Sequence, residues 1–246
     1  MARIFKDNLE MIQEINRELK LSGITVPVKH YQNIQLEGDA QLTKELIGMN
    51  FIINKPWLKK REMLEFIFED ETEKIEEYCK QEFLDRINRD CLNPGNSYKI
   101  RIDLWQALMS RDDNSKFDYT YSERINYKNQ LDNVIDTLKE DKNTRQAMLM
   151  VFQPEDTGNT GGNTRIPCSV SYQFIIRNNK LYVLYYIRSN DYFKHFVIDI
   201  YLTNSIQEYI VSQLKDTYPE LKCGPLNYFA GSLHAYNEDL KRWEIF

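Results

Sequence analysis

The sequence predicts a single α+β domain over residues 1–246, with a β-sheet packed by helices. Segments with the helical period of apolar residues occur beside short β-branched and aromatic runs, so both kinds of element are expected. Of the 246 residues, 42% are hydrophobic, which is enough to build a sizeable core. Because no internal repeat, low-complexity tract or linker divides the chain, one domain accounts for all of it.

The first half of the chain predicts a helix, several strands and a second helical region. Asp7 can cap a helix with apolar residues at helical spacing, and Gly23 ends it. From Ile24 to Ile53, β-branched residues alternate with polar ones, which indicates strands. After Pro56, charged and apolar residues interleave in a pattern that predicts one or two surface helices. Asn93–Asn96 is typical of a turn.

The second half carries the clearest strand signal. Gly158–Asn163 is rich in glycine and asparagine and predicts a flexible loop. Tyr172–Arg177 and Lys180–Arg188 are aromatic and β-branched runs, and the intervening Asn178–Asn179 favours a two-residue hairpin turn. Apolar residues in Ile200–Leu214 recur on approximately one face, so a helix is expected after the hairpin.

Charge, hydropathy and cysteine usage exclude several classes of protein. The net charge of −5 disfavours a broad nucleic-acid surface, and no nucleic-acid partner is expected. No stretch approaches the roughly 18 uncharged apolar residues of a membrane span, and residues 1–20 lack a signal core, so we expect a cytoplasmic chain without a membrane partner. The four cysteines form no C-x-x-C pair, which predicts free thiols, and the three histidines argue against a metal site.

Cys168 is the candidate nucleophile. It follows Pro167 at the start of a predicted strand, with Arg165 and Arg188 nearby, and positive charge stabilises the reactive thiolate. A buried core thiol is the alternative, because free cysteine is among the most buried residue types.

The residues around Cys168 resemble the thymidylate synthase family. The string RIPCSVSYQF at Arg165–Phe174 matches the family's P-C-x-x-x-x-Q-F nucleophile strand, and Arg188–Asp191 matches its R-S-x-D turn. Gly231–Tyr236 resembles its H-x-Y sugar-binding pair. The resemblance is close over residues 140–240 and loose before them. It implies a thymidylate synthase-like mixed sheet packed by helices, and a homodimer formed through the sheet face.

Asp199 indicates which branch of the family the sequence resembles. It lies 31 residues after Cys168, where a synthase that reads uracil has asparagine. A carboxyl group accepts a hydrogen bond from the N4 amino group of cytosine and, when protonated, can donate one to N3. Together with Ser169 in place of the family's histidine, Asp199 makes the resemblance closest to the bacteriophage deoxycytidylate hydroxymethylases. The alternative for Asp199 is a carboxylate that complements a helix dipole.

The resemblance implies a site for the phosphate and sugar of a pyrimidine deoxynucleoside monophosphate. Arg188 and Ser189 would hold the phosphate, since a guanidinium fork and a hydroxyl suit a tetrahedral dianion. Arg145 would reach the phosphate across the interface of the homodimer. The family's second arginine is absent, and whether Arg165 or Lys29 replaces it stays open. The other substrate-binding residues that the resemblance implies are Gln173, His234 and Tyr236.

The resemblance also implies a folate site and an acid–base carboxylate. Asp191 would bond the pterin ring, and Trp105 and Tyr121 would lie beside the cofactor; an ordinary core tryptophan is the alternative for Trp105. Glu82 matches the glutamate of the hydroxymethylase helix, and Glu77 is the reserve candidate. No metal is required.

The implied reaction converts dCMP into 5-hydroxymethyl-dCMP with 5,10-methylenetetrahydrofolate as co-substrate. Cys168 would add to C6 of the pyrimidine and make C5 nucleophilic. Glu82 would organise the water that completes the hydroxymethylation. Two alternatives stay open: a hydroxymethylase or methylase that acts on dUMP or on a ribonucleotide, and a nucleotide-binding homologue without turnover.

Overall fold

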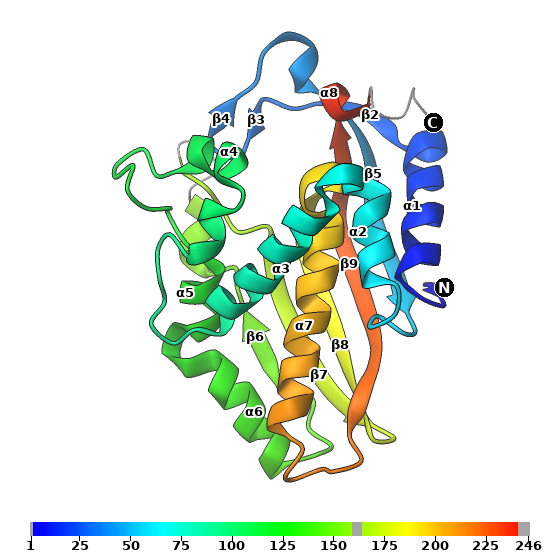
Figure 1. Ribbon diagram of the computed structural model, residues 1–246. Coiled ribbons are helices and arrows are strands. Elements are labelled where there is room, and N and C mark those ends of the chain that lie inside the picture. The colour runs from blue at the N-terminus through cyan, green and yellow to red at the C-terminus, as the bar shows by residue number, and fades with distance from the viewer. Residues whose placement is uncertain (1, 159–163, 241–246) are drawn as a thin grey trace.

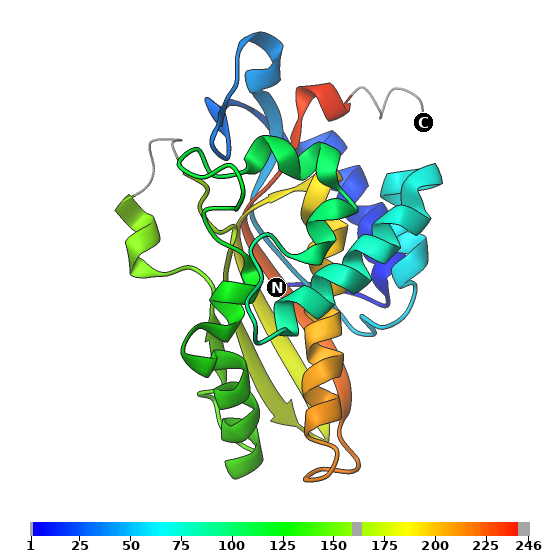
Figure 2. The same cartoon turned by 60° about the vertical axis from the view of Figure 1, so that its left-hand side comes forward.

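The computed structural model describes residues 2–158 and 164–240. Helices lie in front of a twisted sheet in Figure 1, and the turned view in Figure 2 brings its left-hand side forward. The strands are β1 (Arg3–Phe5), β2 (Ile24–Pro27), β3 (His30–Tyr31), β4 (Ile34–Gln35), β5 (Leu42–Ile53), β6 (Met148–Met150), β7 (Ser169–Arg177), β8 (Lys180–Asp191) and β9 (Lys222–Tyr236). The helices are α1 (Asn8–Ser22), α2 (Lys60–Phe68), α3 (Thr72–Ile87), α4 (Ile102–Trp105), α5 (Tyr121–Asn126), α6 (Gln130–Glu140), α7 (Val197–Gln213) and α8 (Asn237–Leu240).

The main sheet is mixed. Its strands follow the order β1-β5-β9-β8-β7-β6, and β2 also pairs with β5. The pairs β1–β5 and β8–β9 are parallel, whereas the other pairs are antiparallel. β3 and β4 form a separate small hairpin. The predicted α+β architecture, a mixed sheet packed by helices, is therefore confirmed.

The two faces of the sheet differ in what covers them. Tyr185 on β8 and Tyr228 on β9 are buried on the face that packs against α7. Leu184, Tyr186 and Phe229 point to the opposite face and remain exposed, and the ring centres of Tyr186 and Phe229 lie 5.1 Å apart. This alternation follows from the two-residue period of a strand. We call the second side the open face.

The N-terminal half forms the elements that the sequence predicts, with one difference. The carboxylate of Asp7 accepts hydrogen bonds from first-turn N–H groups of α1 at 3.1 and 3.2 Å, and Gly23 follows the last helical residue. Strands occupy most of Ile24–Ile53, and within the predicted turn Asn93 and Pro94 form a bend and Asn96 begins a 3-10 turn. The helical region after Pro56 is two helices, but they are not surface helices throughout, because α5 and α7 also cover part of α3.

The predicted hairpin is present. Arg177 pairs with Lys180 at the end of the β7–β8 ladder. Asn178 and Asn179 between them have φ values of 50° and 56°, the left-handed conformation that a two-residue turn between twisted strands requires. Asparagine adopts this conformation more readily than most residues, so local chemistry fixes the register of the strand that begins next to Cys168.

α7 is buried on nearly all sides, whereas its sequence predicts a single apolar face. Polar residues on it are therefore buried as well. The amide of Gln207 donates to the carbonyls of Leu181 and Gly224 at 2.6 and 3.0 Å, at the point where the register of the β8–β9 pair shifts. A Cβ on Gly224 would lie 2.9 Å from the carbonyl oxygen of Leu181, so a side chain does not fit there. These contacts tie α7 to the sheet and fix the position of Asp199 in its first turn.

Three further predictions concern a loop, the cysteines and membrane spans. Residues 159–163 of the predicted loop Gly158–Asn163 lie outside the described residues. The four cysteines all lie within the described ranges and are free thiols, as predicted. None of the helices described is long and apolar enough to cross a membrane.

Candidate active site

One cavity brings the three predicted catalytic residues together. Cys168, just before β7, lines it with Glu82 of α3 and Asp199 of α7. Trp105 and Tyr121 belong to the same wall. We call this space the Asp199 cavity. It joins a thiol, two carboxyl groups and aromatic rings from segments that lie far apart in the sequence.

The thiol of Cys168 has both polar and charged neighbours. Gln32, at the tip of the β3–β4 hairpin, donates a hydrogen bond from Nε2 to Sγ at 3.2 Å. Burial raises the pKa of the Cys168 thiol, and the charges of Arg188 and Arg165 and the Gln32 hydrogen bond oppose this rise. The predicted stabilisation of a thiolate by the two arginines is therefore present, but burial outweighs it, and the thiol keeps its proton.

Asp199 is buried in the first turn of α7. Burial raises its pKa to about 7, while the nearby Arg86 opposes the rise and Glu82 adds to it. A carboxylate that served the helix dipole would be stabilised as an anion, and its pKa would be lowered. The raised pKa argues against the dipole alternative. A carboxyl group with this pKa gains and loses its proton near neutral pH, and Asp199 does so in the cavity that Cys168 also lines.

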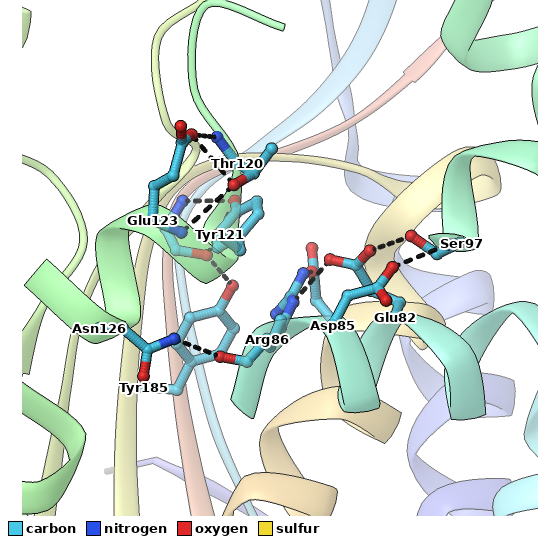
Figure 3. Close-up of polar contacts among 11 residues, drawn as sticks. Glu82, Asp85, Arg86, Ser97, Thr120, Tyr121, Glu123, Asn126 and Tyr185 are labelled. Carbon is cyan, nitrogen blue, oxygen red and sulfur yellow. Dashed lines mark hydrogen bonds and ion pairs between the residues drawn. The ribbon is translucent and has the colours of Figure 1, made fainter. Parts of the chain in front are cut away.

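Glu82 is held by two donors. Its Oε1 accepts a hydrogen bond from Nε of Arg86 at 2.8 Å, and its Oε2 accepts one from the hydroxyl of Ser97 at 2.7 Å (Figure 3). Glu77, the reserve candidate, is exposed and does not line the cavity. The geometry therefore favours Glu82 over Glu77.

A short chain of hydroxyl groups crosses the cavity wall next to the nucleophile. The backbone N–H and the hydroxyl of Ser169 donate to the hydroxyl of Tyr121 at 3.4 and 3.1 Å. The Ser169 hydroxyl also lies 2.6 Å from that of Tyr185. Ser169 thus positions the Tyr121 side chain against the segment that carries Cys168.

A second cavity, the Arg188 cavity, adjoins the first at Cys168. Nε and Nη2 of Arg188 donate to the carbonyls of Pro167 and Ile166 at 2.9 and 3.0 Å, which fixes the guanidinium at the cavity edge. His234 and Tyr236 both reach this cavity from β9, as expected for residues two apart on an extended segment. The predicted site residues that line the Arg188 cavity are Cys168, Arg188, Ser189, Asp191, His234 and Tyr236.

Asp191 lies in the Arg188 cavity and not in the Asp199 cavity. Its Oδ1 accepts hydrogen bonds from the N–H groups of Phe193 and Lys194 at 3.1 and 3.0 Å, and so caps the turn that leads into α7. Burial raises the pKa of Asp191 to about 6, and the charge of Lys194 opposes the rise. One carboxyl oxygen is thus occupied in holding the backbone.

Aromatic rings form another wall of the Asp199 cavity. The ring centres of Phe117 and His195 lie 5.8 and 5.5 Å from that of Trp105. The guanidinium of Arg165 lies 5.2 Å from the centre of the Trp105 ring and 5.0 Å from that of Phe117, a cation–π arrangement. Arg165 does not line the Arg188 cavity, so the geometry does not favour it as the second phosphate arginine.

Three residues predicted to bind substrate lie outside both cavities. Lys29 and Arg145 are exposed. Gln173 pairs with Met148 and Leu184 on the open face, and its amide donates to the carbonyl of Arg145 at 2.8 Å. A residue that serves a second subunit would be exposed in its own chain, so the position of Arg145 is compatible with the predicted dimer. Lys29 and Gln173 do not reach the cavities of their own chain.

Several residues that line these cavities cannot be identified by reasoning from the sequence. Arg86 carries one usable signal, its i,i+4 spacing from Glu82, but this spacing is common on exposed helices. Neither Gln32 nor His195 carries a sequence signal that points to the site. Gln32 contacts Cys168 because the hairpin folds over the site, and its φ of 53° is a conformation that glycine adopts more easily.

Comparisons with known proteins agree with this geometry. The family model described as thymidylate synthase matches residues 39–245. A "Putative thymidylate synthase" of Methanocaldococcus jannaschii is 33% identical over 123 residues, or 49% of this chain and 52% of that protein, so the match spans about half the length of that relative. A protein of Methanosarcina barkeri with the same description is 24% identical over 232 residues, or 91% and 86%. The deoxycytidylate 5-hydroxymethyltransferase of Enterobacteria phage T4 is 26% identical over 202 residues, or 79% and 76%.

A solved structure has the same fold. The thermostable thymidylate synthase A from Bacillus subtilis superposes with a TM-score of 0.63 and 16% sequence identity, covering 98% of this chain and 83% of that one. The resemblance predicted from the motifs around Cys168 is thereby confirmed. Because the family model matches most of the sequence, this chain belongs to the thymidylate synthase family of one-carbon transferases, which bind a pyrimidine nucleoside monophosphate and use methylenetetrahydrofolate.

Proposed function

We propose that this protein hydroxymethylates C5 of dCMP and gives 5-hydroxymethyl-dCMP and tetrahydrofolate. One observation carries the proposal: the candidate nucleophile Cys168 shares a cavity with Asp199, a buried carboxyl group whose pKa is raised to about 7. A carboxyl group that keeps its proton near neutral pH can both donate to and accept from the same base.

Cytosine matches a protonated Asp199. The base offers an amino group at N4 and an acceptor at N3, and a carboxylic acid accepts from the first and donates to the second. An ionised Asp199 would face N3 of cytosine, or O4 of uracil, with a second acceptor, and a buried polar group left unpaired costs about 1–3 kcal/mol. Because a protonated carboxyl group can also accept from N3–H and donate to O4 of uracil, the preference for cytosine rests on the position of Asp199, where a synthase that reads uracil has asparagine.

The aromatic wall of the Asp199 cavity fits a folate. Trp105, Phe117 and Tyr119 line the same space as the candidate nucleophile, and a flat pterin ring packs well against such rings. Methylenetetrahydrofolate supplies the one-carbon unit when it is bound. In this proposal Trp105 and Tyr121 position the co-substrate, and Asp191 would meet it from the adjoining cavity.

The protein's own residues carry the nucleotide chemistry. The thiol of Cys168 loses its proton, and its sulfur forms a bond to C6 of the pyrimidine, which makes C5 nucleophilic. Because burial opposes ionisation of this thiol, the Gln32 hydrogen bond and the charge of Arg188 are needed to offset the cost. After transfer, C5 loses its proton. Glu82 then orients the water whose oxygen adds to the exocyclic carbon, and as the double bond between C5 and C6 re-forms, the bond between sulfur and C6 breaks and the sulfur leaves as a thiolate.

A second candidate, transfer to dUMP, is favoured by a specific observation. Nη1 of Arg86 is buried without a hydrogen-bond acceptor among the residues described, and Nη2 lies 4.0 Å from Oδ1 of Asp199. A donor beside an ionised Asp199 would match O4 and N3–H of uracil. The relatives described as "Putative thymidylate synthase" are compatible with this alternative.

Tritium release separates the candidates. Purified protein is incubated with methylenetetrahydrofolate and with either dCMP or dUMP labelled with tritium at C5. The tritium released is counted, and the mass of the product is measured by mass spectrometry. Release from dCMP with a hydroxymethyl product supports the proposal, and release from dUMP alone or a methyl product refutes it. Binding of dCMP without release would favour a homologue without turnover. CMP in the same assay tests the ribonucleotide alternative.

A homodimer through the open face, with each chain a single domain of residues 1–246, completes the proposal. Leu184, Tyr186 and Phe229 lie side by side on that face, and strand register adds the exposed Met148 and Met150 to them. An exposed surface rich in apolar side chains, with polar residues such as Gln173 between them, is typical of an interface. Such a dimer would bring Arg145 toward the phosphate site of the partner, and analytical ultracentrifugation tests for it.

A further inference from the structure

Arg86 is a buried cation between two carboxyl groups of the Asp199 cavity. Its Nε donates to Glu82 at 2.8 Å (Figure 3), and its Nη2 lies 4.0 Å from Oδ1 of Asp199. The guanidinium also lies 4.1 Å from the centre of the Tyr121 ring, and Asn126 donates to the Arg86 carbonyl at 3.1 Å. Because the Arg86 side chain is 4% exposed, these contacts fix its position.

The two carboxyl groups are held differently. Glu82 accepts one hydrogen bond from the guanidinium and a second from Ser97, which is the pattern of an ionised carboxylate. Asp199 lies beyond hydrogen-bond distance of Arg86. A single cation beside two buried carboxyl groups neutralises the one it bonds, and the other then avoids a buried charge by keeping its proton.

The other titratable groups that interact with Asp199 do not supply a second cation, and Arg165, which lines the same cavity, lies over the rings of Trp105 and Phe117. Burial raises the pKa of each tyrosine and cysteine that interacts with Asp199, so these groups are neutral near pH 7. They are Cys79 on α3, Tyr121 on α5, Cys168 ahead of β7, Tyr172 on β7, Tyr185 on β8 and Tyr228 on β9. Asp85 on α3 accepts hydrogen bonds from the Gln81 side chain and the Ser97 backbone.

We infer that Arg86 is a positioning residue for base recognition: together with Glu82 it sets the protonation of Asp199, and thereby the pH range over which the protein binds its pyrimidine. The inference rests on the proposed function. Arg86 favours the ionised form of Asp199, which would face N3 of cytosine with a second acceptor, and Glu82 favours the protonated form, which can donate to N3 and accept from the N4 amino group. Burial raises the pKa of Asp199, Arg86 opposes the rise and Glu82 adds to it, so that Asp199 keeps its proton up to about pH 7.

Two substitutions should shift the pKa of Asp199 in opposite directions. Glu82→Gln keeps groups that can bond Arg86 and Ser97 but removes the anion, so the unmatched guanidinium lowers the pKa of Asp199. Arg86→Met removes the cation and raises the pKa. The readout is the affinity for dCMP as a function of pH, measured by titration calorimetry without folate, so that no turnover is needed. Lys80→Met, an exposed substitution on the same helix, is the matched control.

We expect the affinity of the unmodified protein for dCMP to fall as the pH rises through about 7. The midpoint should move down by about one pH unit in Glu82→Gln and up by about one unit in Arg86→Met, because a unit charge at this distance interacts at least that strongly. This is about a tenfold change in dissociation constant on the alkaline side. Lys80→Met should not move the midpoint, and Arg86→Lys, which keeps the charge, should leave it close to that of the unmodified protein.

The opposite signs separate this inference from a structural role for Arg86. Shifts of the same sign in both variants, or an unmoved midpoint in Glu82→Gln, would overturn it. If Arg86→Met does not fold, Glu82→Gln and Arg86→Lys still decide the question. Failure of the proposed function looks different, because a protein that reads uracil would bind dUMP in preference to dCMP at every pH, and the two variants would still shift the midpoint of that binding in opposite directions.

Discussion

Replacing Asp199 with asparagine should remove a pH-dependent cost to the folded protein. Burial raises the pKa of Asp199 from 3.8 to about 7, so the folded state holds a proton that the unfolded chain releases. Stability from such a group is fully present below the unfolded value and is lost as the pH rises through the folded value. Between about pH 5 and about pH 8 the loss is about 3 kcal/mol, because roughly two pKa units at about 1.4 kcal/mol each lie between pH 5 and the folded value.

Chemical unfolding at both pH values gives the free energy of unfolding of the unmodified protein and of the asparagine variant. The loss due to Asp199 is the change between the two pH values in the unmodified protein minus the same change in the variant. Other titrating groups, including Asp191, contribute to both proteins and cancel. The asparagine variant should keep about 3 kcal/mol more stability at the higher pH, or about 6–12 °C in melting temperature for a chain of this size. Parallel pH dependences would refute a buried, protonated Asp199. The same variant should shift tritium release from dCMP toward dUMP, because an amide suits N3–H and O4 of uracil.

Three further substitutions test the nucleophile, the dimer and the scaffold. Cys168→Ala should abolish tritium release while dCMP still binds, and unchanged release would exclude covalent addition. An equal mixture of Cys168→Ala and Arg145→Ala chains, refolded together, should regain about a quarter of the activity of the unmodified protein. The reason is that half of the dimers are hybrids, and each hybrid has one complete site of two. No gain in activity over the separate variants would contradict a cross-subunit arginine. Gln207→Leu should lower the free energy of unfolding by about 2–4 kcal/mol, because two buried carbonyls lose their donor, and a urea-unfolding loss of less than about 1 kcal/mol would contradict this account.

The elements that the sequence predicts well are those that local chemistry fixes. Asp7 caps α1 through hydrogen bonds to residues two and three positions away, and Asn178 and Asn179 take the turn conformation that their side chains tolerate. The parallel pairing of β8 with β9 is different, because α7 separates the two strands in sequence. No local pattern specifies that pairing. It was predictable only as a mixed sheet, through the resemblance carried by the motifs around Cys168.

The candidate site divides in the same way. Motif spacing predicts that Cys168 and Asp199 act together, and the structure places both in one cavity. Arg86 escapes such reasoning because its pairing with Glu82 has the same i,i+4 spacing as the pairing of Lys80 with Glu76 on the same helix. The Arg86 side chain is 4% exposed and that of Lys80 is 63% exposed. This difference comes from packing against α5 and α7, and the pattern within the helix does not record it.

Overall similarity does not decide which base the protein accepts, because a relative described as a thymidylate synthase and one described as a deoxycytidylate 5-hydroxymethyltransferase match it at 24% and 26% identity. The choice of base is worth about 1–3 kcal/mol per unpaired group, so it can change while the fold stays the same. In this chain the deciding carboxyl, Asp199, shares its surroundings with Arg86 and Glu82. The pH range in which the base binds is therefore expected to follow the charge balance of these three side chains, even where the rest of the cavity is unchanged.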